Sequence, residues 1–213
     1  MIVRLIAAAL VIAGPIAVRA GTITGSQHDF STSAWSGGRI CVACHTPHKA
    51  DTSITDAPLW NHALSTATYT LYSSPTMDAQ VSQPGGSSKL CLSCHDGTVA
   101  VNSFGGVVGT TNISPANLIG TNLKQSHPIG FTYDTALASL DGSLFDPSTK
   151  TVTIGSGTQT RTGTVASVLL YSGKVECDSC HDVHNTFTVG AAGSGLVKVD
   201  PSGSKVCFAC HNK

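Results

Sequence analysis

Hydrophobic side chains are concentrated at the start of the chain. Residues 5–18 are apolar apart from Gly14 and Pro15, the basic residue Arg4 precedes this run, and the small residue Ala20 follows it closely. A basic start, a short apolar stretch and a small-residue end are typical of a secretory signal peptide. We therefore expect residues 1–20 to be removed and residues 21–213 to be secreted to the extracellular space or cell surface, with the periplasm as the alternative. No later run is long and apolar enough to predict a membrane span.

After residue 20 the hydrophobic positions follow no sustained helical or strand period. The segment Gly21–Arg39 is rich in Gly, Ser and Thr and reads as an extended arm. Residues 135–140 predict a short helix, and β-branched residues on both sides of Gly155-Ser156-Gly157 predict a β-hairpin within residues 149–171. Only 11% of residues are charged and 6% aromatic, with 22 glycines, so a conventional apolar core would be thin.

All eight cysteines occur in four copies of Cys-x-x-Cys-His. The cysteines are Cys41, Cys44, Cys91, Cys94, Cys177, Cys180, Cys207 and Cys210, and the histidines that follow them are His45, His95, His181 and His211. Two thiols at this spacing can form thioethers with the vinyl groups of haem, and the adjacent histidine can bind the iron. We therefore expect four covalently bound haem c groups. Cys₄ zinc sites or a disulfide within each pair are alternatives, but neither explains a histidine at one fixed position.

Five further histidines are candidates for the opposite faces of the four irons: His28, His48, His62, His127 and His184. An iron bound by two histidines has no open position, so it transfers electrons and does not activate substrates. The sequence therefore predicts an electron carrier and not an enzyme. Five candidates for four positions leave one histidine over, and the sequence does not identify it.

Two of these histidines lie three residues after a motif histidine: His48 follows His45, and His184 follows His181. A histidine so close in sequence lies on the same side of its own haem as the motif histidine. We therefore expect His48 and His184 each to bind a neighbouring haem and to hold two haems close together.

Four haems would replace the apolar core that the composition lacks. We expect residues 21–213 to form one tetrahaem c-type cytochrome domain, mostly coil with short helices and a small β-hairpin, wrapped around a stack of four haems. Removal of residues 1–20 takes away two of the twelve basic residues and none of the twelve acidic ones, which leaves a net charge of −2. Haem propionates add negative charge, so the balance argues against nucleic acid as a partner.

Three further stretches carry a resemblance to a known family. They are Gln27-His28-Asp29-Phe30, Pro58-Leu59-Trp60-Asn61-His62 and Ser126-His127-Pro128-Ile129-Gly130. Together with the four motifs, they resemble the extracellular multihaem c-type cytochromes of metal-reducing bacteria, in particular four-haem members whose subunits polymerise into conductive filaments. The resemblance spans nearly all of residues 21–213, although Cys-x-x-Cys-His alone occurs in many cytochromes. It implies a filament (nanowire) subunit, with identical subunits, electron-donor cytochromes and extracellular electron acceptors as partners.

In that family a histidine of one subunit ligates a haem of the next, and His28 is our candidate for this role. It lies thirteen residues before Cys41, and an extended arm of that length spans about 40 Å. The alternative is that His28 folds back onto a haem of its own chain. Two other functions also remain open: a monomeric periplasmic electron shuttle, and a haem reductase with one open iron site.

Overall fold

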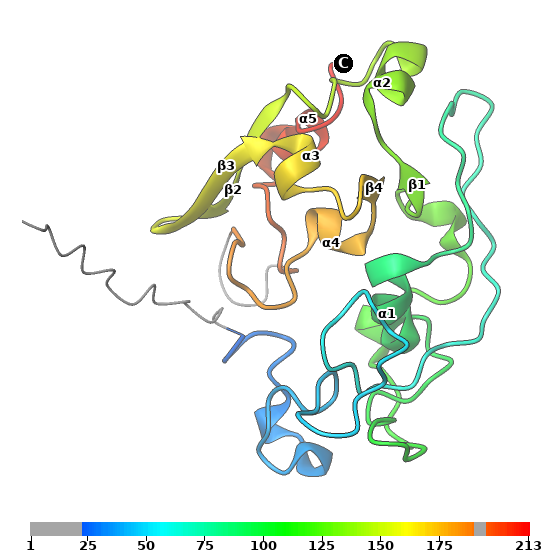
Figure 1. Cartoon of the computed structure of the whole chain (residues 1–213), viewed down its shortest axis with the longest axis vertical. Helices are drawn as coiled ribbons and strands as arrows, with labels where there is room; N and C mark the ends of the chain where they lie inside the picture. Colours follow the sequence, from blue (N-terminus) through cyan, green and yellow to red (C-terminus); the bar gives the residue numbers. More distant parts are fainter. Residues whose placement is uncertain (1–22, 190–194) are drawn as a thin grey trace, which may run out of the picture.

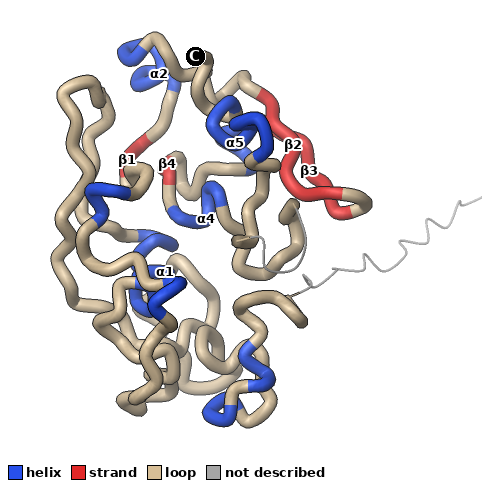
Figure 2. The backbone as a smooth tube through the Cα atoms, turned by 180° about the vertical axis from the view of Figure 1, so that it is seen from behind, coloured by secondary structure: helices blue, strands red, loops and turns tan. Residues whose placement is uncertain are grey.

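The computed structural model describes residues 23–189 and 195–213, and most of this chain is loop (Figure 2). The expected signal peptide, residues 1–20, lies outside the described residues. The α-helices are α1 (Gly86–His95), α2 (Thr135–Asp141), α3 (Val165–Val168), α4 (Cys177–Cys180) and α5 (Lys205–Phe208). The strands are β1 (Phe131–Thr132), β2 (Thr151–Ser156), β3 (Gln159–Thr164) and β4 (Lys174–Val175). Short 3-10 helices are η1 (Phe30–Thr32), η2 (Ala34–Ser36), η3 (Pro115–Asn117), η4 (Leu123–Gln125) and η5 (Ser202–Ser204).

The expected hairpin is confirmed, with a shifted turn. Strands β2 and β3 pair antiparallel from Thr151 opposite Thr164 to Ser156 opposite Gln159. The turn is therefore Gly157-Thr158 and not the triplet that begins at Gly155. Gly157 has φ 59°, a left-handed conformation that two-residue hairpin turns require at their first position.

The expected short helix is present as α2, and its ends have clear local causes. The Asp134 side chain accepts a hydrogen bond from the Leu137 N–H at 2.8 Å, which satisfies one of the free donors of the first turn. At the other end Gly142 has φ 68°, which allows the chain to leave the helix without a Cβ clash.

Two small apolar clusters form the core of the described residues. The larger one lies where α3 packs against the β2–β3 hairpin and includes Phe131, Ile154 and Val165. The smaller one contains Tyr69, Leu92 and Leu123. The described residues therefore have the thin core that the composition predicts. Few contacts join one helix or strand to another.

The N-terminal segment does not form the extended arm that we expected over residues 21–39. From residue 23 onward it folds into η1 and η2, and the Asp29 carboxylate caps η1 by accepting the Ser31 N–H at 3.0 Å. Trp35 then contacts the rings of Phe30 and Phe104, with centroids 5.2 and 5.8 Å apart. These aromatic contacts outweigh the flexibility of a Gly- and Ser-rich sequence and fix the segment to the body of the protein.

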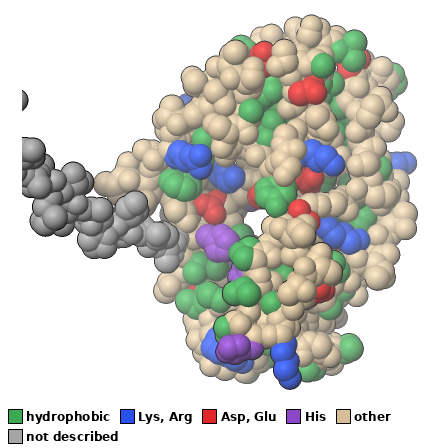
Figure 3. All heavy atoms as spheres, in the orientation of Figure 1, with side chains coloured by type: hydrophobic (Ala, Val, Ile, Leu, Met, Phe, Trp, Pro, Cys, Tyr) green, Lys and Arg blue, Asp and Glu red, His purple; other side chains and the backbone are tan. Residues whose placement is uncertain are grey.

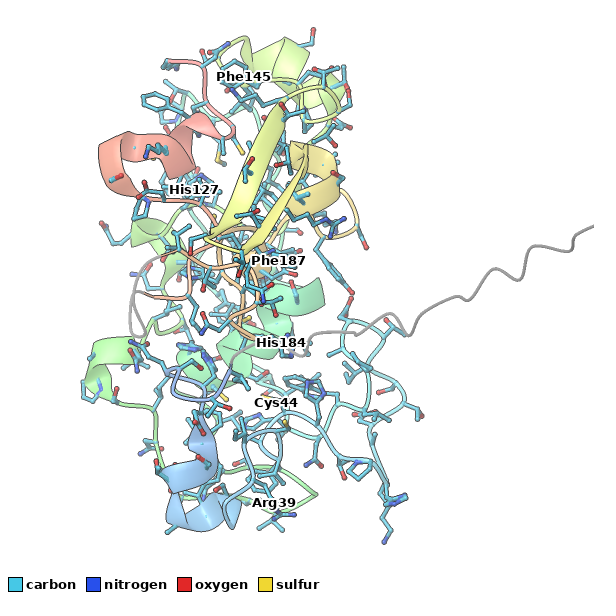
Figure 4. The ribbon with its side chains drawn as sticks, turned by 90° about the vertical axis from the view of Figure 1, so that its left-hand side faces the viewer. Arg39, Cys44, His127, Phe145, His184 and Phe187 are labelled. Atoms are coloured by element: carbon cyan, nitrogen blue, oxygen red, sulfur yellow. The ribbon has the colours of Figure 1, made fainter. Side chains whose placement is uncertain are left out.

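The four Cys-x-x-Cys-His segments follow one another along the long axis of the molecule. Cys44 of the first segment lies in the lower half (Figure 4), whereas α1 and α4, which carry the second and third, lie near the middle (Figure 1). Helix α5, in the fourth segment, lies near the upper end (Figure 1). The order in space is therefore the order in sequence.

Candidate haem-binding site

Each motif folds as one turn of helix, although only the second lies in a long helix. The histidine N–H of the other three motifs donates to the carbonyl of the first cysteine, four residues earlier. These bonds join His45 to Cys41 at 2.8 Å, His181 to Cys177 at 3.1 Å and His211 to Cys207 at 2.8 Å. Residues three apart on a helical turn lie on the same face, so the two thiols of each motif point the same way. This is the arrangement that attachment to one porphyrin edge requires.

Three of the motif histidines are oriented by a backbone carbonyl. The Nδ1 atoms of His45, His95 and His181 lie 2.7, 2.9 and 2.6 Å from the carbonyl oxygens of Pro58, Asn117 and Gly195. A hydrogen bond from Nδ1 fixes the tautomer with a free lone pair on Nε2, which is the usual orienting contact of a metal-binding histidine. Each of these three imidazoles therefore has an unprotonated Nε2 that could bind a metal.

Three motif histidines also lie beside a non-motif histidine. The ring centroids are 6.2 Å apart for His45 and His184, 6.1 Å for His95 and His28, and 6.5 Å for His211 and His127. With a metal–nitrogen bond of about 2 Å and about 1.2 Å from nitrogen to ring centroid, imidazoles on opposite sides of one metal ion have centroids about 6.4 Å apart. The spacing of all three pairs therefore fits one iron between two histidines.

His28 lies beside His95 of the same chain. Its Nδ1 is buried without a hydrogen-bond partner, and burial, followed by the nearby His95, His181 and His184, lowers the pKa of His28 to about 4. A neutral imidazole is the form that binds a metal. Ligation of a neighbouring subunit's haem by His28 stays a prediction, and this geometry favours the intramolecular alternative.

The remaining two candidates, His48 and His62, have no ring contact with a motif histidine among the contacts of the described residues. His48 is exposed on a turn. His62 is only 4% exposed, and its Nε2 lies 3.1 Å from the Ala100 carbonyl and 3.4 Å from the Cys94 thiol. Among the described residues, His48 and His62 are thus the two candidates without a ring contact to a motif histidine, and His181 is the motif histidine without a ring contact to a candidate. Which histidine is spare stays a prediction.

The motifs contact one another in sequence order. The first and second meet through Asn61, which bonds the Cys44 carbonyl at 2.9 Å and is followed by His62 beside Cys94. The second and third meet where α1 packs on α4. There the Cys177 N–H donates to Ser88 Oγ at 2.9 Å.

Interactions between the thiols also join successive motifs, from the second to the third and from the third to the fourth. A hydrogen bond with the Cys177 thiol, together with burial, raises the pKa of Cys91, and Cys180 is near enough to Cys207 and Cys210 to interact electrostatically. All eight cysteines are unpaired, and the residues that the structure describes contain no group of three or more side chains able to hold a metal ion. No Cys₄ cluster is therefore present in this part of the chain.

Figure 3 shows an opening through the middle of the molecule, with histidine, hydrophobic and charged side chains at its edge.

Trp60 is buried close to two of the candidate ligands. Its ring makes edge contacts with His45 at 6.2 Å and His62 at 6.5 Å. Trp60 therefore contacts one motif histidine and one non-motif histidine.

Two aspartates matter at this site that the sequence reasoning missed: Asp96 and Asp182, each directly after a motif histidine. Asp96 is 5% exposed. Burial raises the pKa of Asp96, but hydrogen bonds from Ser65, Tyr69 and Thr98 outweigh it and hold that pKa below its ordinary value. The signal in the sequence was the His-Asp dipeptide that follows the second and third motifs.

Comparison with known proteins adds no relative: no family model matches the chain, and neither does any curated protein. Within residues 23–189 and 195–213, none of the helices has the length and apolar character needed to cross a membrane.

Proposed function

We propose that this protein is an exported four-haem electron carrier whose subunits assemble into a filament. The observation that carries the proposal is the set of three ring pairs, each joining a motif histidine to a non-motif histidine at 6.1–6.5 Å. Four helical turns, each with two free thiols on one face, support covalent attachment. The donor set present is therefore the one that a bis-histidine c-type haem needs.

Each side chain has a defined role in this proposal. The two thiols of a motif would hold one haem, and the motif histidine would bind its iron. His184, His28 and His127 would bind the opposite faces of the first, second and fourth irons, and either His48 or His62 that of the third. When bound, haem iron supplies reversible one-electron chemistry. The carbonyl contacts of His45, His95 and His181 would leave Nε2 of these three histidines free for the metal.

Ligation by two protein side chains is the reason to propose electron transfer and not catalysis. A reductase acting at haem needs an iron with an open or weakly held position. The paired histidines would close that position at three of the irons, and two candidates remain for the other. We therefore propose that the protein is not an enzyme.

The arrangement along the long axis supports a filament over a shuttle. The first and fourth motifs lie toward opposite ends of the described residues. An array that reaches both ends of a molecule can meet an identical subunit at either end, whereas a shuttle needs only one exposed haem edge. The proposed partners are identical subunits, electron-donor cytochromes and extracellular acceptors.

Mass spectrometry and electron cryo-microscopy of the secreted protein test this proposal together. We expect the mass of residues 21–213 with four haems attached, and filaments with haem density continuous between subunits. Unmodified cysteines, disulfides within the motifs or bound zinc would contradict haem attachment. Four haems in particles that are always monomeric would favour the shuttle instead.

A further inference from the structure

The loop that presents His184 is closed by one carboxylate. Asp182 Oδ1 accepts the His184 N–H at 3.0 Å, and Asp182 Oδ2 accepts the N–H groups of Thr186 and Phe187 at 2.9 and 2.8 Å. Three backbone donors within five residues of Asp182 therefore end on its side chain. A carboxylate is the side chain suited to this task, because both of its oxygens accept and neither donates.

The same loop is anchored to the rest of the protein. Phe187 packs against the larger apolar cluster, and the Thr188 carbonyl accepts a hydrogen bond from Ser156 Oγ of β2 at 2.9 Å. Asp182 itself is tied to Leu196 through its N–H at 2.8 Å. Asp182 thus connects a fixed support to the backbone of His184, whose ring lies 20° from parallel to that of His45.

The first motif provides an internal comparison. Thr46 occupies the position after His45 that Asp182 occupies after His181, and among the described residues its hydroxyl bonds to the His48 backbone, at 2.8 Å to the carbonyl. His48 is exposed and has no ring contact with a motif histidine among the described residues. The second histidine is thus held against a partner where the carboxylate is present, and not where threonine replaces it.

We propose that Asp182 is the positioning residue that holds His184 as the distal ligand of the first haem. This inference rests on the proposed function, since it concerns one ligand of that site. Asp182 touches neither the iron nor the porphyrin in this proposal; it acts through the backbone of residues 184–187.

The test is Asp182→Asn in the full-length, haem-loaded protein. An amide nitrogen cannot accept a hydrogen bond. Asparagine therefore keeps the size of the side chain but loses the hydrogen bonds that one of the two carboxylate oxygens accepts. We expect electron paramagnetic resonance at neutral pH to show loss of one of four low-spin irons, with a matching high-spin signal, while the mass still shows four haems. Added imidazole should restore the low-spin signal. Asp182→Thr, which copies the first motif, should show the same loss.

His184→Ala should lose the same iron, and the double variant with Asp182→Asn should lose no more than either single one. Asp134→Asn is the matched control, because Asp134 also accepts a backbone N–H but caps α2, a helix that carries none of the candidate histidines. It should keep all four low-spin irons. Four low-spin irons in both Asp182 variants, with one lost in His184→Ala, would overturn the role of Asp182. Four low-spin irons in His184→Ala would overturn the assignment of His184 as a ligand. A wild-type protein without attached haem would overturn the proposed function.

Discussion

Asp96→Asn is the substitution whose cost follows most directly from the structure. Asp96 Oδ1 accepts the N–H and hydroxyl of Thr98 at 2.7 and 2.8 Å, and Oδ2 accepts the hydroxyls of Ser65 and Tyr69, the latter at 2.6 Å. These four hydrogen bonds join the segment before α1 to the residues directly after His95. Asparagine has the same shape but keeps only one acceptor oxygen.

The backbone N–H of Thr98 cannot turn away, so the amide oxygen should face it and the amide nitrogen should face the two hydroxyls. The two hydroxyls then lose their acceptor, and the two Thr98 donors keep a neutral oxygen in place of a charged one. Hydrogen bonds to charged groups contribute about 1.5–3 kcal/mol each, and because hydroxyls can rotate we take the lower value for both, about 3 kcal/mol of unfolding free energy. For a chain of this length, that loss lowers the midpoint of thermal unfolding by about 6–12 °C.

The assay is unfolding of the haem-loaded protein followed by circular dichroism at several pH values. Hydrogen bonds hold the pKa of Asp96 below its ordinary value, so its stabilisation is present above the unfolded pKa of about 3.9 and is lost as pH falls through the lower folded pKa. The gap between wild type and Asp96→Asn should therefore narrow in acid. Asp51→Asn is the control, since exposed Asp51 also accepts two bonds from Ser53. An equal loss in that control, or a gap independent of pH, would refute the reasoning.

Two further predictions concern the histidine pairs. His127→Ala should convert one low-spin iron to high spin while four haems stay attached, because His127 lies opposite His211; an unchanged electron paramagnetic resonance spectrum would show that another group ligates the fourth iron. His28→Ala should remove the distal ligand of the second iron but leave filaments intact, because His28 lies beside His95 of its own chain; monomers or short oligomers by microscopy would show instead that His28 crosses between subunits.

The local parts of this site were predictable from sequence. A helical turn depends only on residues close in the chain, so Cys-x-x-Cys-His specifies the relation of two thiols and one histidine wherever it occurs. The β2–β3 hairpin is local for the same reason. Its turn was misplaced because Gly155 and Gly157 are both glycine, and pairing of Gly155 with Thr160 moved the turn by two residues.

The pairing of histidines was not predictable, because it depends on where loops without periodicity meet in space. Nothing near His45 in sequence indicates that its partner comes from the loop after the third motif. The His-x-x-His spacing indicated that His184 reaches away from its own motif, and the structure agrees. The same spacing at His48 has no such contact in the described chain, and Thr46 stands there in the place of Asp182.

The most direct test of the central claim is low-temperature electron paramagnetic resonance of the oxidised, purified wild-type protein, integrated against protein concentration. Four irons that are each bound by two histidines should give only low-spin ferric signals, amounting to four per chain. A high-spin signal in the assembled protein, or an integrated intensity well below four, would contradict the account.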